Sequence, residues 1–220
     1  MPCPYQDEMT YDPERHHRRS IRLRGYDYRQ PGAYFVTICT QDRECIFGEA
    51  VDGRIVLNVP GQMVETVWRE LPQHYPGMQL DAFVVMPNHV HGIIVLVGAG
   101  PSACPDGSAQ RREVIGQPQG AMGQPQGVAP TMSLPYVVHR FKSLTTARYS
   151  QGVLQDGWRP FPGRLWQRNY YEHIVRAEDE LSRVRRYIAD NPAHWEEDRE
   201  NPKFPLPERR RGRPCRAPTL

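Results

Sequence analysis

Residues 84–96 read VVMPNHVHGIIVL, in which two apolar runs flank a Pro-Asn pair. Apolar runs of this length around a turn signal predict two buried strands joined as a hairpin. Alternate side chains of a strand share a face, so His89 and His91 project side by side, about 7 Å apart at Cα, and Val90 faces the core. The imidazoles can converge on one metal ion, or they can be hydrogen-bonded core residues. Histidine is unusual in an otherwise Val/Ile/Leu hairpin, which favours a bound ligand.

The composition indicates one domain with irregular appendages. The chain has 220 residues, of which 39% are hydrophobic and 22 are prolines. This length allows a substantial core, and the proline content indicates that part of the chain is irregular. The net charge is only +3, but arginines gather in residues 15–29, 183–186 and 209–213. Such clusters are either nucleic-acid contacts or solvated surface.

Cysteine usage and hydropathy bear on the compartment. The five cysteines form no CxxC pair, which predicts neither a disulfide framework nor a zinc ribbon and favours a reducing cytoplasm. No apolar run approaches the roughly 18 residues that a membrane span needs. We therefore expect a cytoplasmic protein without a membrane partner.

The periodicity of apolar residues predicts an alternation of strands and helices. In order, we expect a strand at 33–40, a small hairpin at 50–57, a helix at 60–71 ended by Pro72, strands at 80–86 and 89–97, a helix beginning at Ser133, a short extended segment at 161–168, and a helix ending at 190–192. Helices packed mainly on one face of a central antiparallel sheet make an α+β sandwich of ferredoxin-like type.

The same pattern divides the chain. Residues 1–31 form a basic and aromatic arm, residues 32–195 form the central domain, and residues 196–220 form a basic, proline-rich tail. Within the domain, residues 98–132 are too poor in apolar side chains to offset their ordering entropy, which predicts a flexible inserted loop.

Several motifs around the histidine pair point to a family. They are MPNHVH at 86–91, GYDY at 25–28, YFVT at 34–37 and LWQRNY at 165–170. Together they resemble the REP-associated tyrosine transposases, relatives of the single-strand HUH transposases of small insertion sequences. The likeness covers most of residues 15–195 apart from the inserted loop.

The resemblance implies a metal-dependent cleavage of single-stranded DNA. In that family two histidines, here His89 and His91, hold a divalent cation against the scissile phosphate. A tyrosine hydroxyl attacks the phosphorus to form a 5′-phosphotyrosine. By match to the family's tryptophan-glutamine-x-x-tyrosine pattern the nucleophile would be Tyr170, with Tyr171 as second choice.

The third metal ligand stays open between three residues. The family adds a polar side chain from near the tyrosine, which would be His173, with Glu172 and Gln167 as alternatives. Some relatives have a glutamine four residues after the tyrosine, where this chain has Ile174. The expected ion is Mg²⁺ or Mn²⁺, because oxygen ligands from phosphate and water complete the shell, and added imidazoles favour Mn²⁺.

The implied partner is single-stranded or hairpin DNA, bound by a monomer or a homodimer. We expect DNA contacts from the arm and from the second helix, at Arg22, Arg24, Tyr26, Tyr28, Arg140 and Lys142. Two other functions compete with a transposase and nicking endonuclease. One is a catalytically silent protein that binds repeat hairpins, and the other is an unrelated HxH hydrolase that uses water in place of tyrosine.

Overall fold

A four-stranded antiparallel sheet forms the centre of the computed structural model, which describes residues 22–23, 25–97 and 132–204. Its strand order is β4 (Met78–Val85), β5 (His89–Leu96), β1 (Gly32–Cys39) and β6 (Tyr171–Val175). Each neighbouring pair is antiparallel. Most of the predicted arm, inserted loop and tail lies outside the described residues.

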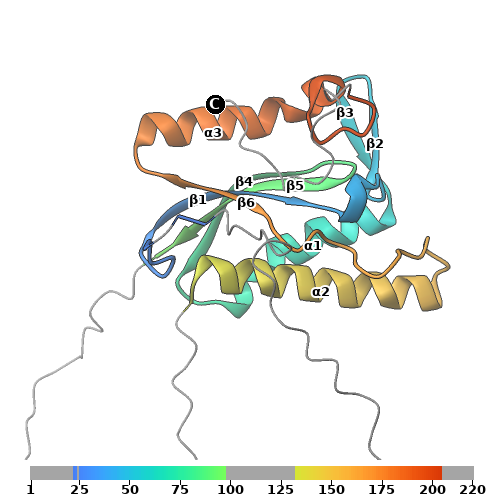
Figure 1. The fold of residues 1–220 in the computed structure, drawn as a ribbon, viewed down its shortest axis with the longest axis horizontal. Helices are drawn as coiled ribbons and strands as arrows, with labels where there is room; N and C mark the ends of the chain where they lie inside the picture. The colour runs from blue at the N-terminus through green and yellow to red at the C-terminus, as the bar shows by residue number, and fades with distance from the viewer. Residues whose placement is uncertain (1–21, 24, 98–131, 205–220) are drawn as a thin grey trace, which may run out of the picture.

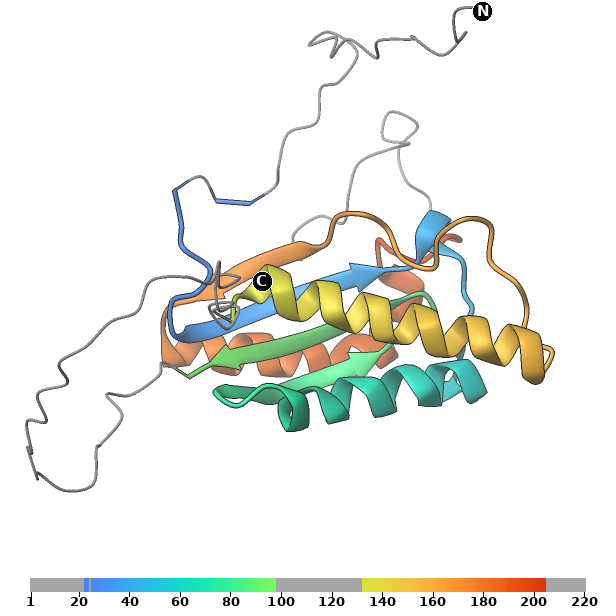
Figure 2. The same ribbon diagram turned by 90° about the horizontal axis from the view of Figure 1, so that it is seen from below.

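Helices cover both faces of this sheet (Figure 1). On one face lie α1 (Val59–His74) and α2 (Leu134–Gln155), as Figure 2 shows from below. On the other face lie α3 (Glu178–Asp190) and the 3-10 helix η2 (Asn191–Glu197). The strand order and the two helices that share a face match the split βαβ arrangement, so the predicted α+β ferredoxin-like fold is confirmed.

Strand alternation divides the apolar residues between two cores. Tyr34, Val36 and Ile38 of β1 belong to the core under α1 and α2. Phe35 faces the other way and packs with Ile93 and Val184 under α3. Gly92 of β5 lets α1 pack closely against the strand, because the indole of Trp68 occupies the space that a Cβ would need. The two central strands are therefore buried on both faces, as their apolar sequences predict.

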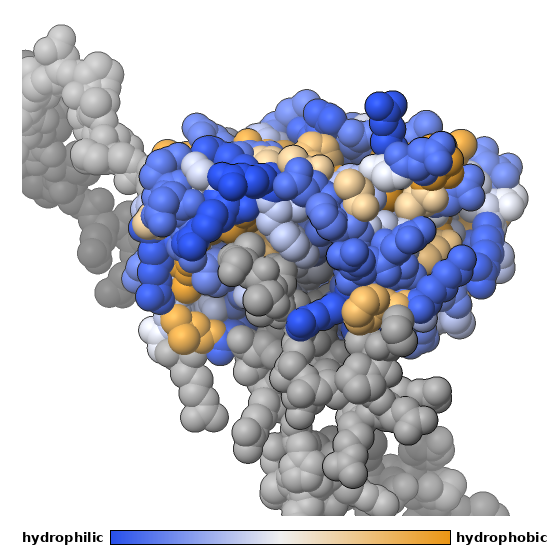
Figure 3. All heavy atoms as spheres, turned by 90° about the horizontal axis from the view of Figure 1, so that it is seen from above, coloured by the Kyte–Doolittle hydropathy of each residue, from blue (hydrophilic) through white to orange (hydrophobic). Residues whose placement is uncertain are grey.

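The outer surface of α3 is hydrophilic (Figure 3). Arg183 and Arg186 are exposed, whereas Val184 and Ile188 are buried against the sheet. This division follows the helical period, in which residues three and four apart share a side. Among the described residues no helix is both long enough and apolar enough to cross a membrane.

The smaller elements agree in part with the sequence. The hairpin of β2 (Gly48–Val51) and β3 (Arg54–Leu57) turns at Asp52-Gly53, where both residues have positive φ as a type I′ turn requires. A short 3-10 helix, η1 (Gln41–Arg43), follows β1. Pro72 does not end α1, which continues to His74, because a proline in the last turn removes only one hydrogen bond near the helix end.

Two predicted boundaries are displaced. The last strand is Tyr171–Val175, whereas the predicted segment 161–168 contributes one isolated bridge, between Trp166 and Thr40. The domain also extends past residue 195, because Glu200 and Asn201 are buried and the Asn88 side chain donates to the Glu200 carbonyl. At the other end, Tyr28 of the predicted arm is a buried core residue.

Candidate metal centre

The two histidines occupy the first and third positions of β5 and point to the α3 face. Their Nε2 atoms lie 3.0 Å apart, and the exposed fractions of His89 and His91 are 0% and 2%. Val90 between them is buried in the core on the opposite face. The expected convergence of the imidazoles is thus present in the structure.

Hydrogen bonds fix the orientation of each ring. The Asn88 side-chain nitrogen donates to the carbonyls of Arg43 and Glu200, which leaves Asn88 Oδ1 as an acceptor. His89 Nδ1, at 2.8 Å, donates to that oxygen, so the network assigns a free lone pair to His89 Nε2. His91 Nδ1 lies 2.9 Å from the Thr37 hydroxyl oxygen, which can accept a hydrogen bond from it in the same way. Both Nε2 atoms can then act as ligands.

Asp198 completes a three-ligand cluster. Its Oδ1 accepts from the Glu200 amide, whereas Oδ2 is buried without a hydrogen-bond partner in the described part of the chain. Oδ2 lies 3.6 Å from His89 Nε2, and ligand atoms of His89, His91 and Asp198 all lie within 4.8 Å of one another. Two imidazole nitrogens and one unpaired carboxylate oxygen fit a divalent cation, which would neutralise that buried charge.

Burial keeps both rings neutral. It lowers the pKa of His89 to about 3, with a smaller contribution from the Arg43 charge. Burial also lowers the pKa of His91, and the His89 ring adds to this effect while the Asp198 carboxylate opposes it. At neutral pH the His89–Asp198 contact is therefore no ion pair, and the imidazoles are in the form that binds metals.

Tyr187 of α3 supplies a phenol beside this cluster. Its Oη lies 3.4 Å from His91 Nε2, and the two rings have centroids 5.3 Å apart. Burial and the Asp198 carboxylate raise the pKa of Tyr187, whereas a hydrogen bond from the Asn191 side chain lowers this pKa. Asn191 stands four residues after Tyr187, is 5% exposed and has a buried Oδ1 without a partner among the described residues. This oxygen is a further possible metal ligand.

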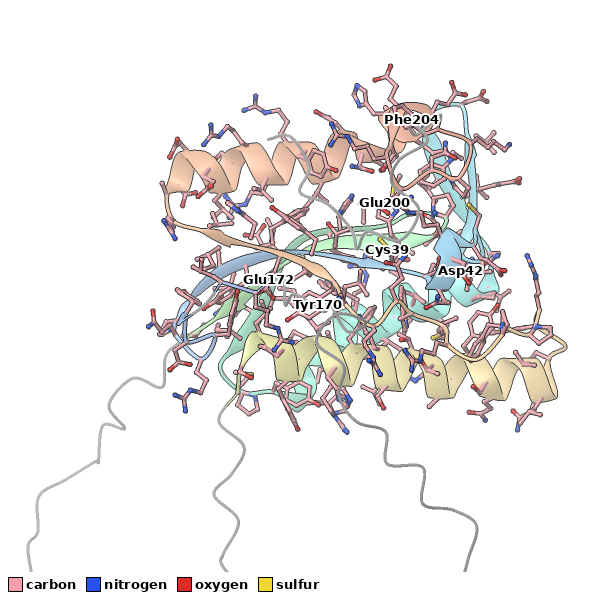
Figure 4. All side chains as sticks on the ribbon, in the orientation of Figure 1. Cys39, Asp42, Tyr170, Glu172, Glu200 and Phe204 are labelled. Atoms are coloured by element: carbon pink, nitrogen blue, oxygen red, sulfur yellow. The ribbon has the colours of Figure 1, made fainter. Side chains whose placement is uncertain are left out.

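Tyr170, the nucleophile expected from the motif, lies on the other face of the sheet. The registers pair Thr37 of β1 with both His91 and Tyr171, so Tyr171 shares the histidine face and Tyr170 points away from it. Figure 4 shows Tyr170 on the side of α2, where it belongs to the core under α1 and α2. The expectation that Tyr170 meets the imidazoles is therefore wrong, because one residue along a strand reverses the side-chain direction.

The expected third ligands are also elsewhere. His173 Nε2 lies 2.7 Å from Glu180 of α3, and the residue stands opposite Phe35 in the sheet, beyond the histidine pair. Glu172 shares the face of Tyr170, and the Gln167 amide donates to the Cys39 carbonyl. Tyr171, the second choice as nucleophile, packs its ring on Phe35. Asp198 was missed because it lies in a segment interpreted as tail. Tyr187 was missed because none of the recognised motifs includes it.

The predicted DNA contacts fall into two groups. Arg22 and Arg140 are exposed, and Arg140 donates to the Tyr75 hydroxyl. Tyr28 packs in a ring cluster with Tyr26 and Tyr34.

Lys142 bonds the carbonyls of Gln167, Arg168 and Asn169, so it supports the chain before β6. Arg24 lies outside the described residues.

One cysteine departs from expectation. Cys39 is disulfide-bonded, whereas Cys45 is free. The absence of a CxxC pair therefore did not exclude a disulfide. Disulfides can form between cysteines far apart in sequence, which local spacing does not reveal.

Comparisons with known proteins give one clear relative. The chain is 37% identical over 185 residues to an uncharacterized protein of Haemophilus influenzae, a match that covers 83% of this chain and 92% of that protein. No protein-family model matches the chain.

Two solved structures are similar. One is a REP-associated tyrosine transposase bound to a REP hairpin, with 17% identity, a TM-score of 0.47, and 79% of this chain and 73% of that chain covered. The other is a candidate transposase from Deinococcus radiodurans, with 20% identity, a TM-score of 0.37, and coverage of 77% and 95%.

Proposed function

The chain belongs to the family of the Haemophilus influenzae protein, whose name assigns no activity, and from its own site we propose that it is a metal-dependent single-stranded DNA transposase. It cleaves and rejoins DNA through a 5′-phosphotyrosine, and its substrate is a palindromic repeat hairpin with adjoining single strand. The motifs at 25–28, 34–37 and 86–91, which resemble those of REP-associated tyrosine transposases, support this proposal.

One observation carries the proposal: a phenol stands next to a cluster fit for a divalent cation. Tyr187 Oη is 3.4 Å from His91 Nε2, and His91 belongs to the cluster with His89 and Asp198. A hydrolase that activates water at the same histidines would have no need of this tyrosine. We therefore transfer the role of nucleophile from Tyr170 to Tyr187.

The reaction exchanges one phosphoester for another. Tyr187 Oη forms a bond to phosphorus, the bond from phosphorus to the 3′ oxygen breaks, and in net terms the phenol proton moves to that leaving oxygen. Attack by another 3′-hydroxyl on the phosphotyrosine reverses these steps and joins strands without an added energy source. When bound, a cation held by His89, His91 and Asp198 would withdraw charge from the phosphoryl oxygens and help orient the phosphodiester.

The chain's own groups prepare this chemistry. Asn88 and Thr37 hold the imidazoles so that both Nε2 atoms face the cluster. A phenol whose pKa is raised by burial stays protonated at neutral pH, so Tyr187 is unreactive until positive charge arrives beside it. Mg²⁺ or Mn²⁺ is the proposed ion, and two imidazoles with one carboxylate favour Mn²⁺.

The test is a covalent adduct. Labelled single-stranded hairpin DNA is incubated with the protein and Mn²⁺, then denatured and separated by electrophoresis. We expect a labelled protein band that disappears in Tyr187→Phe and in His89→Ala but persists in Tyr170→Phe and Tyr171→Phe, the matched controls. An adduct that survives Tyr187→Phe and is lost in Tyr170→Phe would return the nucleophile to the opposite face.

The two competing functions give different results in the same assay. A catalytically silent hairpin-binding protein binds the DNA without any adduct, and its binding survives Tyr187→Phe and His89→Ala. A water-using hydrolase cuts DNA without an adduct and needs the histidines alone. Among the expected contacts, exposed Arg22 and Arg140 are proposed to meet the DNA backbone. Action as a monomer or homodimer in the cytoplasm stays a prediction.

A further inference from the structure

The segment that carries Asp198 is tied to the sheet by buried contacts outside the metal cluster. We call residues 198–201 the return segment, because the chain comes back to the sheet there after η2. Its Glu200 is only 5% exposed, and glutamate is rarely buried unless it is paired. Figure 4 shows Glu200 at the end of the sheet that also holds Asp42 of η1. The proposed cleavage reaction assigns no role to Glu200.

Arg43 of η1 is a charged partner of Glu200. Its Nε donates to Glu200 Oε2 at 2.8 Å, and the two side chains are 25% and 7% exposed. The backbone of η1 is strained here, because Asp42 and Arg43 both adopt left-handed conformations, with φ of 55° and 58°. Strain of this kind persists only where the surrounding structure holds it in place. The ion pair therefore joins a strained turn after β1 to the return segment.

One buried amide connects both of these segments to the histidines. Asn88 Nδ2 donates to the carbonyls of Arg43 and Glu200, at 3.0 and 2.7 Å. The Oδ1 atom of the same side chain accepts from His89 Nδ1. Because a single amide makes all three contacts, a shift of the return segment would also disturb the His89 ring.

The backbone of Glu200 fixes the side chain of Asp198. The Glu200 amide donates to Asp198 Oδ1 at 2.7 Å, which is the hydrogen bond of an Asx turn. With that oxygen engaged, Oδ2 is the atom that lies 3.6 Å from His89 Nε2. The position of Glu200 therefore determines where the third ligand of the cluster points.

Electrostatics alone would give Arg43 the opposite effect on a bound cation. Its positive charge contributes to the low pKa of His89, so this charge is close enough to act on the cluster. A positive charge near a metal site repels the ion, and its removal should strengthen binding. The sign of the change in metal affinity on substituting Arg43 therefore separates a positioning role from a charge effect.

We propose that Arg43 and Glu200 are positioning residues of the metal centre, which hold the return segment so that Asp198 reaches the cation. Neither residue touches the ion, and both act through Asp198. This inference rests on the proposed function, which supplies the cation and its three ligands. Asn88 and Thr37 orient the imidazoles, whereas this pair orients the carboxylate. Partners outside the ligand shell commonly set ligand geometry in this way.

The test is isothermal titration of Mn²⁺ into the metal-free full-length protein and its variants. We expect Arg43→Gln to weaken Mn²⁺ binding by about 10-fold to 100-fold, because it removes the charge that pairs with the buried Glu200 carboxylate and releases the return segment. Glu200→Gln should weaken binding less, since its amide oxygen still accepts from Arg43 and the partly exposed guanidinium can reach water. Charge alone predicts the reverse order. Arg43→Lys, which keeps the charge, should retain most of the affinity.

Two comparisons show whether the pair acts through Asp198. In an Asp198→Ala background, where the two histidines still bind the ion weakly, Arg43→Gln should cause little further loss. Arg199→Gln, the matched control, removes a positive charge from the exposed neighbour of Asp198 and should leave the affinity unchanged or slightly higher. Near-ultraviolet circular dichroism checks the fold of each variant. The isosteric Glu200→Gln, measured with and without Asp198→Ala, carries the same test if Arg43→Gln does not fold.

The outcomes separate this inference from the proposed function. If Arg43→Gln binds Mn²⁺ as tightly as the wild type, or more tightly, the positioning role is refuted even when the wild type forms its covalent adduct through Tyr187. An equal loss with and without Asp198 also refutes it, because the pair would then support the fold as a whole. If binding follows the expected pattern but no adduct forms, the positioning role stands and the cleavage reaction is refuted. A wild type that does not bind Mn²⁺ refutes the metal centre and this inference together.

Discussion

At the scale of single residues, the metal centre depends on groups that never touch the ion. The Thr37 hydroxyl, 2.9 Å from His91 Nδ1, must accept a hydrogen bond from that nitrogen if Nε2 is to bind a metal. Thr37 is buried, so no water can readily take its place. Partners of this kind fix the tautomer and the angle of a ligand ring.

Thr37→Val is therefore expected to weaken Mn²⁺ binding by about 10-fold to 100-fold while the fold is retained. Valine keeps the shape of threonine, so the loss measures the hydroxyl alone. The measurement is isothermal titration of Mn²⁺ into the metal-free protein. Thr66→Val, at an exposed helical threonine that bonds the Gln62 carbonyl, is the control. Equal affinities in both variants would show that the tautomer of His91 is set by something other than Thr37.

For single residues, the sequence predicts the metal ligands that lie on one strand. It does not predict the ligands that come from distant segments. His89 and His91 are two residues apart, so a local rule suffices to place them together. Tyr187 and Asp198 reach the same point only because α3 and the segment after η2 fold back over the sheet. The motif at 165–170 gave Tyr170 instead, and no local pattern indicates on which face of β6 a residue will lie until the register with β1 is known.

At the scale of elements, the position of β5 depends on one close contact with α1. Gly92 has no side chain, and the Trp68 indole lies directly against its backbone. The sequence marks this place only as a glycine inside a strand, which signals a close approach without naming the partner. The contact sets the separation of α1 from the strand that carries both histidines.

We expect Gly92→Ala to lower the free energy of unfolding by about 1–3 kcal/mol, because the new methyl group overlaps the Trp68 ring. Urea denaturation followed by circular dichroism measures the change. Trp68→Phe, which makes room, should restore part of the loss in the double variant, giving a coupling energy between the two sites. If the double variant loses the sum of the two single effects, the collision with Trp68 is not the cause.

Elements with a clear periodicity of apolar residues were predicted well. The strand that is defined by its pairing with a neighbouring strand was not. The helices α1 and α2 and the central hairpin follow from apolar spacing. β6 is five residues long and half-buried throughout, so its sequence offers no alternation, and only the free edge of β1 defines it. Helix α3 was predicted, but the face of the sheet on which it packs was not. An amphipathic pattern shows which side of a helix is buried, not which side of a sheet the helix covers.

At the scale of the whole molecule, the order of elements predicts the fold class, whereas the site joins distant parts of the chain. The histidines come from the central sheet, and Asp198 comes from the end of the described chain, after η2. Since one oxygen of Asp198 is buried and unpaired, this segment bears a cost that a cation would remove. Metal binding should therefore stabilise the packing of the segment on the sheet.

Mn²⁺ is accordingly expected to raise the melting temperature of the wild-type protein. A ligand that binds only the folded state stabilises it by about 2.7 kcal/mol when present at 100 times its dissociation constant. Asp198→Asn removes the charge that the cation neutralises, and the rise should shrink or vanish, although the metal-free variant should be no less stable than the wild type. Glu197→Gln changes the exposed neighbouring residue and should keep the full rise. Because both variants lose one negative charge close to the centre, a rise that persists equally in both would mean that Mn²⁺ is held without Asp198, and Asn191 would then be the next ligand to test.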